Sequence, residues 1–182
     1  MADRAFTGIR ACVFDAYGTL FDFASAAAGC ADALGDRAAA LTAMWRDRQL
    51  QYTWLRAVQG RHADFWQVTG EALDFTLEAL QLRATGLRER LMNLYLTLAV
   101  FPEVPQLMRS LKAAGLTTAI LSNGSPAMLR AAVTNAGLGE LLDPQLSVEE
   151  VGVYKPHPKV YQLAVDRLAF RPEAILFLSS NA

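Results

Sequence analysis

The chain has 182 residues, of which 53% are hydrophobic, so it can bury one sizeable core and carry a small accessory domain. A formal net charge of −1 gives no long-range field, which argues against a nucleic-acid partner or an anionic membrane surface. The apolar stretches have strand length, the N-terminus does not resemble a signal peptide, and Cys12 and Cys30 lack zinc-site spacing. We therefore expect a cytoplasmic protein with buried thiols.

The first predicted element is a buried strand that ends in an aspartate. Residues 11–14 read Ala-Cys-Val-Phe, Asp15 follows directly, and Gly18 then breaks the extended pattern. In open α/β sheets, ligands bind in the crevice beyond the carboxyl ends of the strands. Asp15 is therefore a candidate nucleophile or metal ligand, and the alternative is an aspartate that caps a turn.

From about residue 22 to about residue 98 the pattern contains no strand. This stretch is predicted to be an all-helical insertion that leaves the sheet directly after Asp15. We expect a helical cap domain over residues 21–98 and a discontinuous core domain formed by residues 1–20 and 99–182.

Four helices are expected in the insertion, and the first is an alanine-rich run over residues 25–34. The second helix ends at Gly60, residues 61–66 look irregular, and the last helix carries leucines as far as Leu98. The predicted N-caps of the three later helices are Asp36, Thr69 and Thr85.

Strands and helices alternate in the second half of the chain. The predicted strands are 117–121, 145–148 and a buried one over 174–178, and the predicted helices are 102–114, 125–137 and 158–168. Ser125 and Pro126 form an N-cap and N1 pair, and Gly115 and Gly137 end two of the helices. This alternation predicts an α/β fold with a Rossmann-like parallel sheet.

Small polar residues follow these later strands as well. Ser122 and Asn123 come after one strand, and Ser179 and Asn181 come after another. Each of them alone also fits a turn or a helix cap, but their repetition at successive strand ends favours a site around Asp15. Lys155 precedes a proline, which favours an extended backbone that can direct its ammonium group inward; an exposed loop lysine is the alternative.

Phe-Asp-Ala-Tyr-Gly-Thr-Leu, residues 14–20, resembles the first motif of the haloacid dehalogenase superfamily, Asp-x-Asp-x-Thr or Val followed by Leu. Asp15 matches the nucleophile, Thr19 matches the threonine, and Tyr17 replaces the second aspartate that phosphatase members use as general acid and base. A phenol, with a pKa of about 10, suits that role poorly, whereas a departing halide needs no proton. The form Asp-Ala-Tyr-Gly-Thr-Leu-Phe is similar to that of the L-2-haloacid dehalogenases.

The other motifs of the superfamily have similar counterparts. Ser122 resembles the second motif and Lys155 the third. The fourth motif holds magnesium through acidic residues in the phosphatases, but here Ser179, Ser180 and Asn181 occupy it, as in the L-2-haloacid dehalogenases. The resemblance therefore implies a reaction without a metal or another cofactor.

Within the insertion, Trp45-Arg46 resembles the arginine motif of the dehalogenase cap, although Arg46 by itself reads as a solvated helix residue. The resemblance also implies that Leu50 and Phe65 line the pocket, while ordinary core positions are the alternative. Asp47 stands where the family leads us to expect a glutamine. The implied substrate-binding residues are Tyr17, Arg46, Leu50, Phe65, Ser122, Asn123 and Tyr161.

The resemblance implies hydrolytic dehalogenation of short L-2-haloalkanoic acids to 2-hydroxy acids with inversion. Asp15 would attack C2 to form an ester, the halide would leave beside Arg46 and Asn123, and water would then cleave the ester. The implied catalytic residues are Asp15, Thr19, Arg46, Ser122, Lys155, Ser179 and Asn181.

The chain ends at Ala182, before an aspartate that these dehalogenases carry shortly after the Ser-Ser-Asn motif. We therefore expect a C-terminally truncated chain, in which the general base for ester hydrolysis is unassigned. The alternatives are a magnesium-dependent phosphatase of the same superfamily and a catalytically impaired fragment whose helices form an interaction surface. The family also implies a homodimer.

Overall fold

A sheet of four parallel strands lies at the centre of the molecule in the computed structural model, which describes residues 7–180. Strand β1 (Ala11–Phe14) pairs with β2 (Thr117–Ser122) on one side and with β4 (Ile175–Leu178) on the other. Strand β3 (Gln145–Ser147) pairs with β2, so the order is β3-β2-β1-β4. The predicted α/β fold with a Rossmann-like parallel sheet is confirmed.

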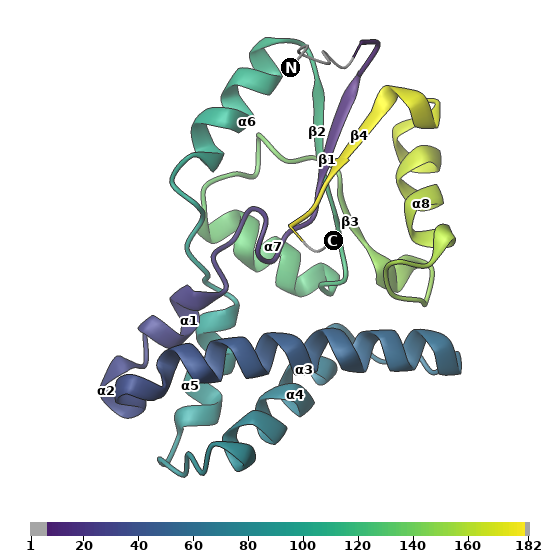
Figure 1. Ribbon diagram of the computed structural model, residues 1–182. Coiled ribbons are helices and arrows are strands. Elements are labelled where there is room, and N and C mark those ends of the chain that lie inside the picture. The colour runs from purple at the N-terminus through teal and green to yellow at the C-terminus, as the bar shows by residue number, and fades with distance from the viewer. Residues whose placement is uncertain (1–6, 181–182) are drawn as a thin grey trace, which may run out of the picture.

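Helices cover both faces of this sheet (Figure 1). Helices α6 (Val104–Ala113) and α7 (Pro126–Asn135) lie on one side, and α8 (Pro158–Leu168) lies on the other. Every residue of β1 is buried as a result, as expected for a central strand of a parallel sheet. Helix α7 begins at the predicted N-cap, Ser125.

The insertion between β1 and β2 is helical, and the structure shows no strand in it over residues 22–98. Its helices are α1 (Ala24–Ala28), α2 (Ala31–Leu34), α3 (Ala38–Gln59), α4 (Phe65–Ala79) and α5 (Leu87–Tyr95). Helix α3 has 22 residues and runs across the insertion, past the carboxyl ends of the strands (Figure 1). It ends at Gly60, as predicted, with that glycine in the left-handed region at φ 65°.

The two segments that join the insertion to the sheet run side by side. The Asp22 amide donates to the Ala99 carbonyl over 2.7 Å, and the Phe101 amide donates to the Leu20 carbonyl over 3.1 Å. The chain therefore leaves the sheet and returns to it at one place, beside the end of β1.

The three N-caps predicted in the insertion are wrong. Asp36 lies within a short 3₁₀ helix and Arg37 is the N-cap of α3, while Gly86, not Thr85, is the N-cap of α5. Helix α4 begins at Phe65 behind Asp64, whose carboxylate accepts from the Trp66 amide over 2.6 Å. Short polar residues also occur inside helices, where a threonine hydroxyl bonds to the preceding turn, so residue type alone did not locate the caps.

Two boundaries in the insertion and the burial of one strand also differ from the sequence-based expectation. The alanine-rich run splits into two short helices at Gly29, where a Cβ atom would lie 2.8 Å from a Leu94 methyl carbon. The last helix of the insertion ends at Tyr95 rather than near Leu98. Strand β4 is half-buried rather than buried, because in the described chain it pairs with β1 only.

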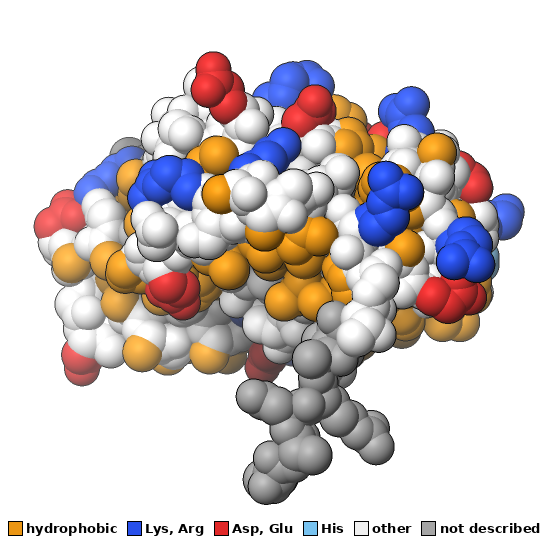
Figure 2. Space-filling model, turned by 90° about the horizontal axis from the view of Figure 1, so that it is seen from above, with side chains coloured by type: hydrophobic (Ala, Val, Ile, Leu, Met, Phe, Trp, Pro, Cys, Tyr) orange, Lys and Arg blue, Asp and Glu red, His pale blue; other side chains and the backbone are white. Residues whose placement is uncertain are grey.

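Charged side chains of both signs are interspersed on the face of the molecule seen in Figure 2, with hydrophobic side chains between them. This distribution agrees with the formal net charge of −1. Over the described residues, no helix combines the length and the apolar character needed to cross a membrane. Cys12 and Cys30 are buried free thiols, as predicted.

Candidate active site

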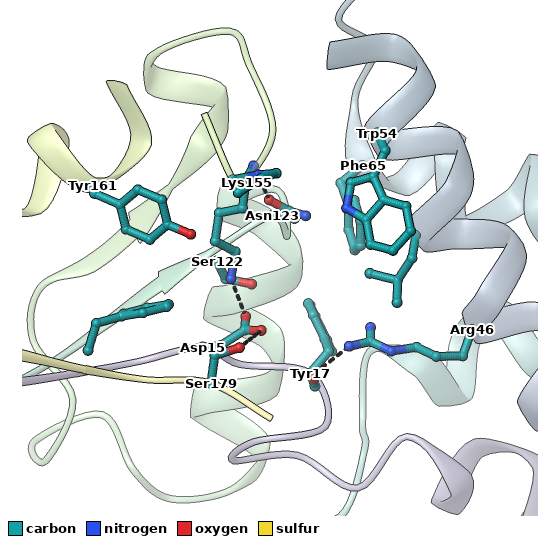
Figure 3. Close-up of a pocket in the computed structure, with 13 residues that line it drawn as sticks. Asp15, Tyr17, Arg46, Trp54, Phe65, Ser122, Asn123, Lys155, Tyr161 and Ser179 are labelled. Atoms are coloured by element: carbon teal, nitrogen blue, oxygen red, sulfur yellow. Dashed lines mark hydrogen bonds and ion pairs between the residues drawn. The ribbon is translucent and has the colours of Figure 1, made fainter. Parts of the chain in front are cut away.

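A cavity of about 190 Å³ lies between the carboxyl ends of the strands and helices α3 and α4. The residues around it come from both halves of the chain (Figure 3). Ten of the residues selected from the sequence line it: Asp15, Tyr17, Arg46, Leu50, Phe65, Ser122, Asn123, Lys155, Tyr161 and Ser179. The fold thus brings together side chains separated by more than 160 positions in the chain.

Asp15 follows the last residue of β1, and within residues 7–180 its carboxylate contacts Lys155, the Ala16 amide and Ser179. Oδ1 lies 2.7 Å from the Lys155 ammonium nitrogen and accepts from the Ala16 amide over 2.8 Å. Oδ2 accepts from the Ser179 hydroxyl over 3.3 Å (Figure 3). The Asp15 side chain is only 6% exposed, so these contacts replace most of the water that would otherwise solvate its charge.

Lys155 reaches Asp15 from the loop before α8. Its ammonium group also donates to the Leu121 carbonyl over 3.3 Å, and its amide donates to Asn123 Oδ1 over 3.1 Å. Burial lowers the pKa of Lys155, and the neighbouring Asp15 carboxylate opposes that fall. Lys155 is therefore a cation at the cavity whose side chain is only 12% exposed, and the alternative of an exposed loop lysine is wrong.

The last residue of β2, Ser122, and the first residue after it, Asn123, are two of the polar cavity residues. Ser122 is fully buried, and its hydroxyl oxygen accepts from the Gly124 amide over 3.2 Å. Gly124 packs against the Tyr17 ring, where a Cβ atom would lie 2.8 Å from ring carbon Cε2. The bond from the Lys155 amide uses the side-chain oxygen of Asn123, so that within residues 7–180 its NH₂ group is left for a ligand.

Tyr17 forms the floor between the two sides of the cavity (Figure 3). Its ring stacks on Phe65 with centroids 6.0 Å apart, and it lies 5.0 Å from the Tyr95 ring. Its hydroxyl is buried and, within residues 7–180, has no hydrogen-bond partner. Burial, more than the nearby Tyr95 and Asp15, raises the pKa of Tyr17, so this phenol stays neutral and is poorly suited to general acid-base catalysis.

Arg46 reaches the cavity from α3. Its Nη2 donates to the Tyr17 carbonyl over 3.0 Å, and its Nη1 donates to Gln49 Oε1 over 3.4 Å. The guanidinium packs over Gly18, which has φ +84° and where a Cβ atom would lie 3.6 Å from Nη2. Arg46 is therefore not the solvated helix residue that its charged neighbours alone indicated.

Arg46, Leu50 and Trp54 lie four residues apart on one face of α3, and all three line the cavity. Trp54 was missed in the sequence, although its spacing from Arg46 and Leu50 could have identified it. Phe177 and Pro156 also line the cavity and were missed, because a strand interior and a residue after lysine carry no comparable signal.

One of the predicted catalytic residues that the structure describes, Thr19, does not line the cavity. Thr19 holds the segment after β4 instead: its hydroxyl oxygen accepts from the Ser180 amide over 2.9 Å and donates to the Ser180 hydroxyl over 3.2 Å. Asn181 lies outside the described residues. Over residues 7–180, no three His, Cys, Asp or Glu side chains are grouped so that they could hold a metal ion.

Comparison with known families gives this arrangement a context. The family model described as haloacid dehalogenase-like hydrolase matches residues 9–182. The chain belongs to this family. Among relatives of this haloacid dehalogenase-like hydrolase, (S)-2-haloacid dehalogenase 1 of Pseudomonas sp. (strain CBS-3) is 52% identical, over 96% of this chain and 77% of the relative. The (S)-2-haloacid dehalogenase of Xanthobacter autotrophicus is 46% identical, over 95% of this chain and 68% of the relative.

The chain also superposes on solved dehalogenase structures. A crystal structure of a dehalogenase superposes with a TM-score of 0.94 at 47% identity, over 97% of this chain and 78% of that one. The L-2-haloacid dehalogenase of Xanthobacter autotrophicus with covalently bound chloropropionic acid superposes with a TM-score of 0.87 at 45% identity, over 94% and 70% of the two chains. The predicted resemblance to L-2-haloacid dehalogenases is confirmed.

Proposed function

We propose that this protein hydrolyses short L-2-haloalkanoic acids to 2-hydroxy acids, with inversion at C2, through an ester on Asp15. The observation that carries the proposal is the Asp15 carboxylate, which contacts Lys155 over 2.7 Å in a cavity whose described lining contains no second carboxylate. The relatives named above are (S)-2-haloacid dehalogenases, and one solved neighbour holds chloropropionic acid covalently.

In the first step, a carboxylate oxygen of Asp15 attacks C2 of the substrate from the side opposite the halogen. The new carbon–oxygen bond forms as the carbon–halogen bond breaks, and the halide leaves with the bonding electron pair. Arg46 and the Asn123 NH₂ group are the donors for that halide. Hydrogen-bond donors that are already in place where negative charge develops need no reorganisation during the reaction.

Ser122 and Lys155 bind the carboxylate of the substrate, which an ionised Asp15 would otherwise repel. Tyr17, Leu50, Phe65 and Tyr161 surround its alkyl part. In the second step, water attacks the carbonyl carbon of the ester, which releases the 2-hydroxy acid and a proton and restores Asp15. We assign Ser179 and Thr19 to orient Asp15 and the segment after β4, and Asn181 to position Lys155 or the water.

We further propose that residues 21–98 act as a cap domain and that residues 1–20 with 99–182 act as the core domain. The reaction in this proposal uses no metal and no other cofactor, because the described lining of the cavity offers no carboxylate besides Asp15, whereas magnesium prefers several carboxylate oxygens. A homodimer fits the exposed apolar residues Leu55 and Val58 of α3. We propose a cytoplasmic location, and neither a nucleic acid nor a membrane as partner, which agrees with the small net charge.

The test is incubation of the purified chain with racemic 2-chloropropionate without added metal, while chloride release and the remaining enantiomer are followed. We expect chloride release that consumes only the L form and that disappears in Asp15→Asn. Mass spectrometry of the intact protein detects an ester on Asp15 if the second step is slow. An unmodified mass together with no chloride release would overturn the proposal.

A further inference from the structure

A group of three buried polar residues lies behind the side of the cavity that helices α3 and α4 form. Gln49 of α3 and Thr69 of α4 have no exposed surface, and neither does Tyr95 at the end of α5. The Gln49 amide nitrogen donates to the Thr69 hydroxyl over 2.8 Å and to the Tyr95 hydroxyl over 3.1 Å. We call Gln49, Thr69 and Tyr95 the buried polar cluster.

An apolar residue would fill the Gln49 position at no desolvation cost, so the amide needs another explanation. A buried amide destabilises the fold unless its donors and acceptor are bonded. Here both N–H groups are used, and Gln49 Oε1 accepts from Arg46 and lies 3.4 Å from the Tyr95 hydroxyl. A polar group bonded in this way restricts its partners to one arrangement.

The buried polar cluster contacts residues that line the cavity. Arg46 Nη1 donates to Gln49 Oε1, while Nη2 of the same guanidinium donates to the Tyr17 carbonyl. The Thr69 hydroxyl donates to the Phe65 carbonyl over 2.7 Å, at the first residue of α4. The Tyr95 ring packs on the Tyr17 ring, with centroids 5.0 Å apart. Each member of the cluster therefore contacts a different residue of the cavity.

We propose that the buried polar cluster positions Arg46 for the departing halide. This inference rests on the proposed function, because it deepens the role given there to Arg46. Arginine has a long side chain with many rotamers, so a fixed guanidinium needs contacts on more than one edge. The Tyr17 carbonyl holds one edge, and the cluster, through Gln49, holds another. Gln49, Thr69 and Tyr95 thus act as positioning residues that do not touch the substrate.

A comparison of two leaving groups, chloride and bromide, distinguishes a cluster that positions Arg46 from a cluster that only stabilises the fold. Chloride leaves carbon less readily than bromide, so it depends more on the cation that stabilises its developing charge. Loss of the cluster should therefore reduce kcat/KM more for 2-chloropropionate than for 2-bromopropionate. The ratio of kcat/KM values contains only the steps up to the irreversible loss of halide, so a slow ester hydrolysis does not mask the effect.

Helix α4 offers a matched pair of variants for this test. Thr69 and Thr76 are both fully buried, and each donates to the carbonyl four residues earlier, over 2.7 Å and 2.8 Å. Of the two, only Thr69 bonds to Gln49. We expect Thr69→Val to raise the bromide-to-chloride ratio of kcat/KM by about threefold to tenfold, the equivalent of weakening one hydrogen bond to a charged group. Thr76→Val should leave the ratio unchanged.

Tyr95→Phe tests the same cluster with a smaller disturbance and should change the ratio in the same direction. In an Arg46→Met background, Thr69→Val should produce no further change in the ratio, because the group that it positions is gone. Equal bromide-to-chloride ratios of kcat/KM in Thr69→Val and Thr76→Val would overturn the inference. So would a change in this ratio on Thr69→Val that is as large in the Arg46→Met background as in the wild type.

A measurement of chloride binding tests the positioning role of the cluster separately from the proposed function. If the wild-type protein releases no halide from either acid, the proposed function fails. Line broadening of the chloride NMR signal then reports whether the wild type binds chloride and whether Thr69→Val weakens that binding. Weaker binding in Thr69→Val but not in Thr76→Val would support the positioning role, and equal binding in both variants would overturn it.

Discussion

The cavity has a strand-end wall and a helical wall, and they differ in chemistry. On the strand-end wall, Asp15 and Ser122 lie at the ends of strands and Lys155 lies in a loop, and an ion pair and hydrogen bonds hold them. The helical wall is largely apolar, with Leu50 and Trp54 beside the single long polar side chain of Arg46.

This contrast indicates that the two walls have different roles in the reaction. Strand ends are rigid and bring polar groups from distant parts of the chain to one place, which suits the groups that make and break bonds. A helix presents side chains every three or four residues along one face, which suits a wall that determines which alkyl group fits. The predictions below test this difference in roles by changing one wall at a time.

The largest effect is expected on the strand-end wall, from Lys155→Met. The variant removes the cation 2.7 Å from Asp15 and the positive charge proposed to hold the substrate carboxylate. We expect kcat/KM for 2-chloropropionate to fall by at least about a hundredfold, as for the loss of one preorganised electrostatic contact. Chloride release under pseudo-first-order conditions measures it, and a loss below about tenfold would contradict the role of Lys155.

The pH dependence of the reaction tests the role of the Lys155 ammonium group in the wild-type protein, without a substitution. Burial lowers the pKa of Lys155, so its ammonium group is lost at a lower pH than that of an exposed lysine. We expect kcat/KM to be constant at lower pH and to fall about tenfold per pH unit above an apparent pKa below the ordinary lysine value.

Lys155→Arg is the control for this profile. An arginine stays charged throughout the accessible range, so whatever activity remains in the variant should no longer decline with that alkaline pKa. An unchanged alkaline limb in Lys155→Arg would assign the ionisation to another group.

Arg46→Lys tests the polar residue of the helical wall with a smaller expected effect. The variant keeps the charge but loses the guanidinium fork, which bonds to the Tyr17 carbonyl and to Gln49 at the same time. We expect a fall of about tenfold in kcat/KM for 2-chloropropionate, the equivalent of one hydrogen bond to a charged group. The unfolding midpoint should change little, and a large drop in it would indicate a structural role instead.

The two walls also differ in how far the sequence alone could predict them. Strand-end residues such as Asp15 and Ser122 follow short apolar runs, and the topology of parallel sheets brings such ends together, so physical reasoning located them. Arg46 was different, since its charged neighbours indicated a solvated helix face and only the resemblance to a known family selected it. The side of a helix that meets another domain is determined by long-range packing, which no local pattern contains.

The same limit explains the missed helix caps and the buried polar cluster. Thr69 has the residue type of an N-cap, but its hydroxyl bonds inside α4 to Phe65 and accepts from Gln49 on α3. A contact between two helices that are joined by a loop depends on their relative rotation. Residue spacing within either helix does not predict that rotation.

The smallest effect is expected from Trp54→Ala, at the mouth of the helical wall. Trp54 is half-exposed and lies two turns of α3 beyond Arg46, so it should contact only the outer carbons of a longer substrate. We expect little change in kcat/KM for 2-chloropropionate and a fall of about fivefold for 2-chlorohexanoate, since each buried CH₂ contributes about 0.8 kcal/mol. Leu55→Ala is the control, because Leu55 is similarly exposed on the same helix but does not line the cavity. If Trp54→Ala slowed both substrates equally, Trp54 would act on the reaction itself, and the difference in roles between the two walls would not hold.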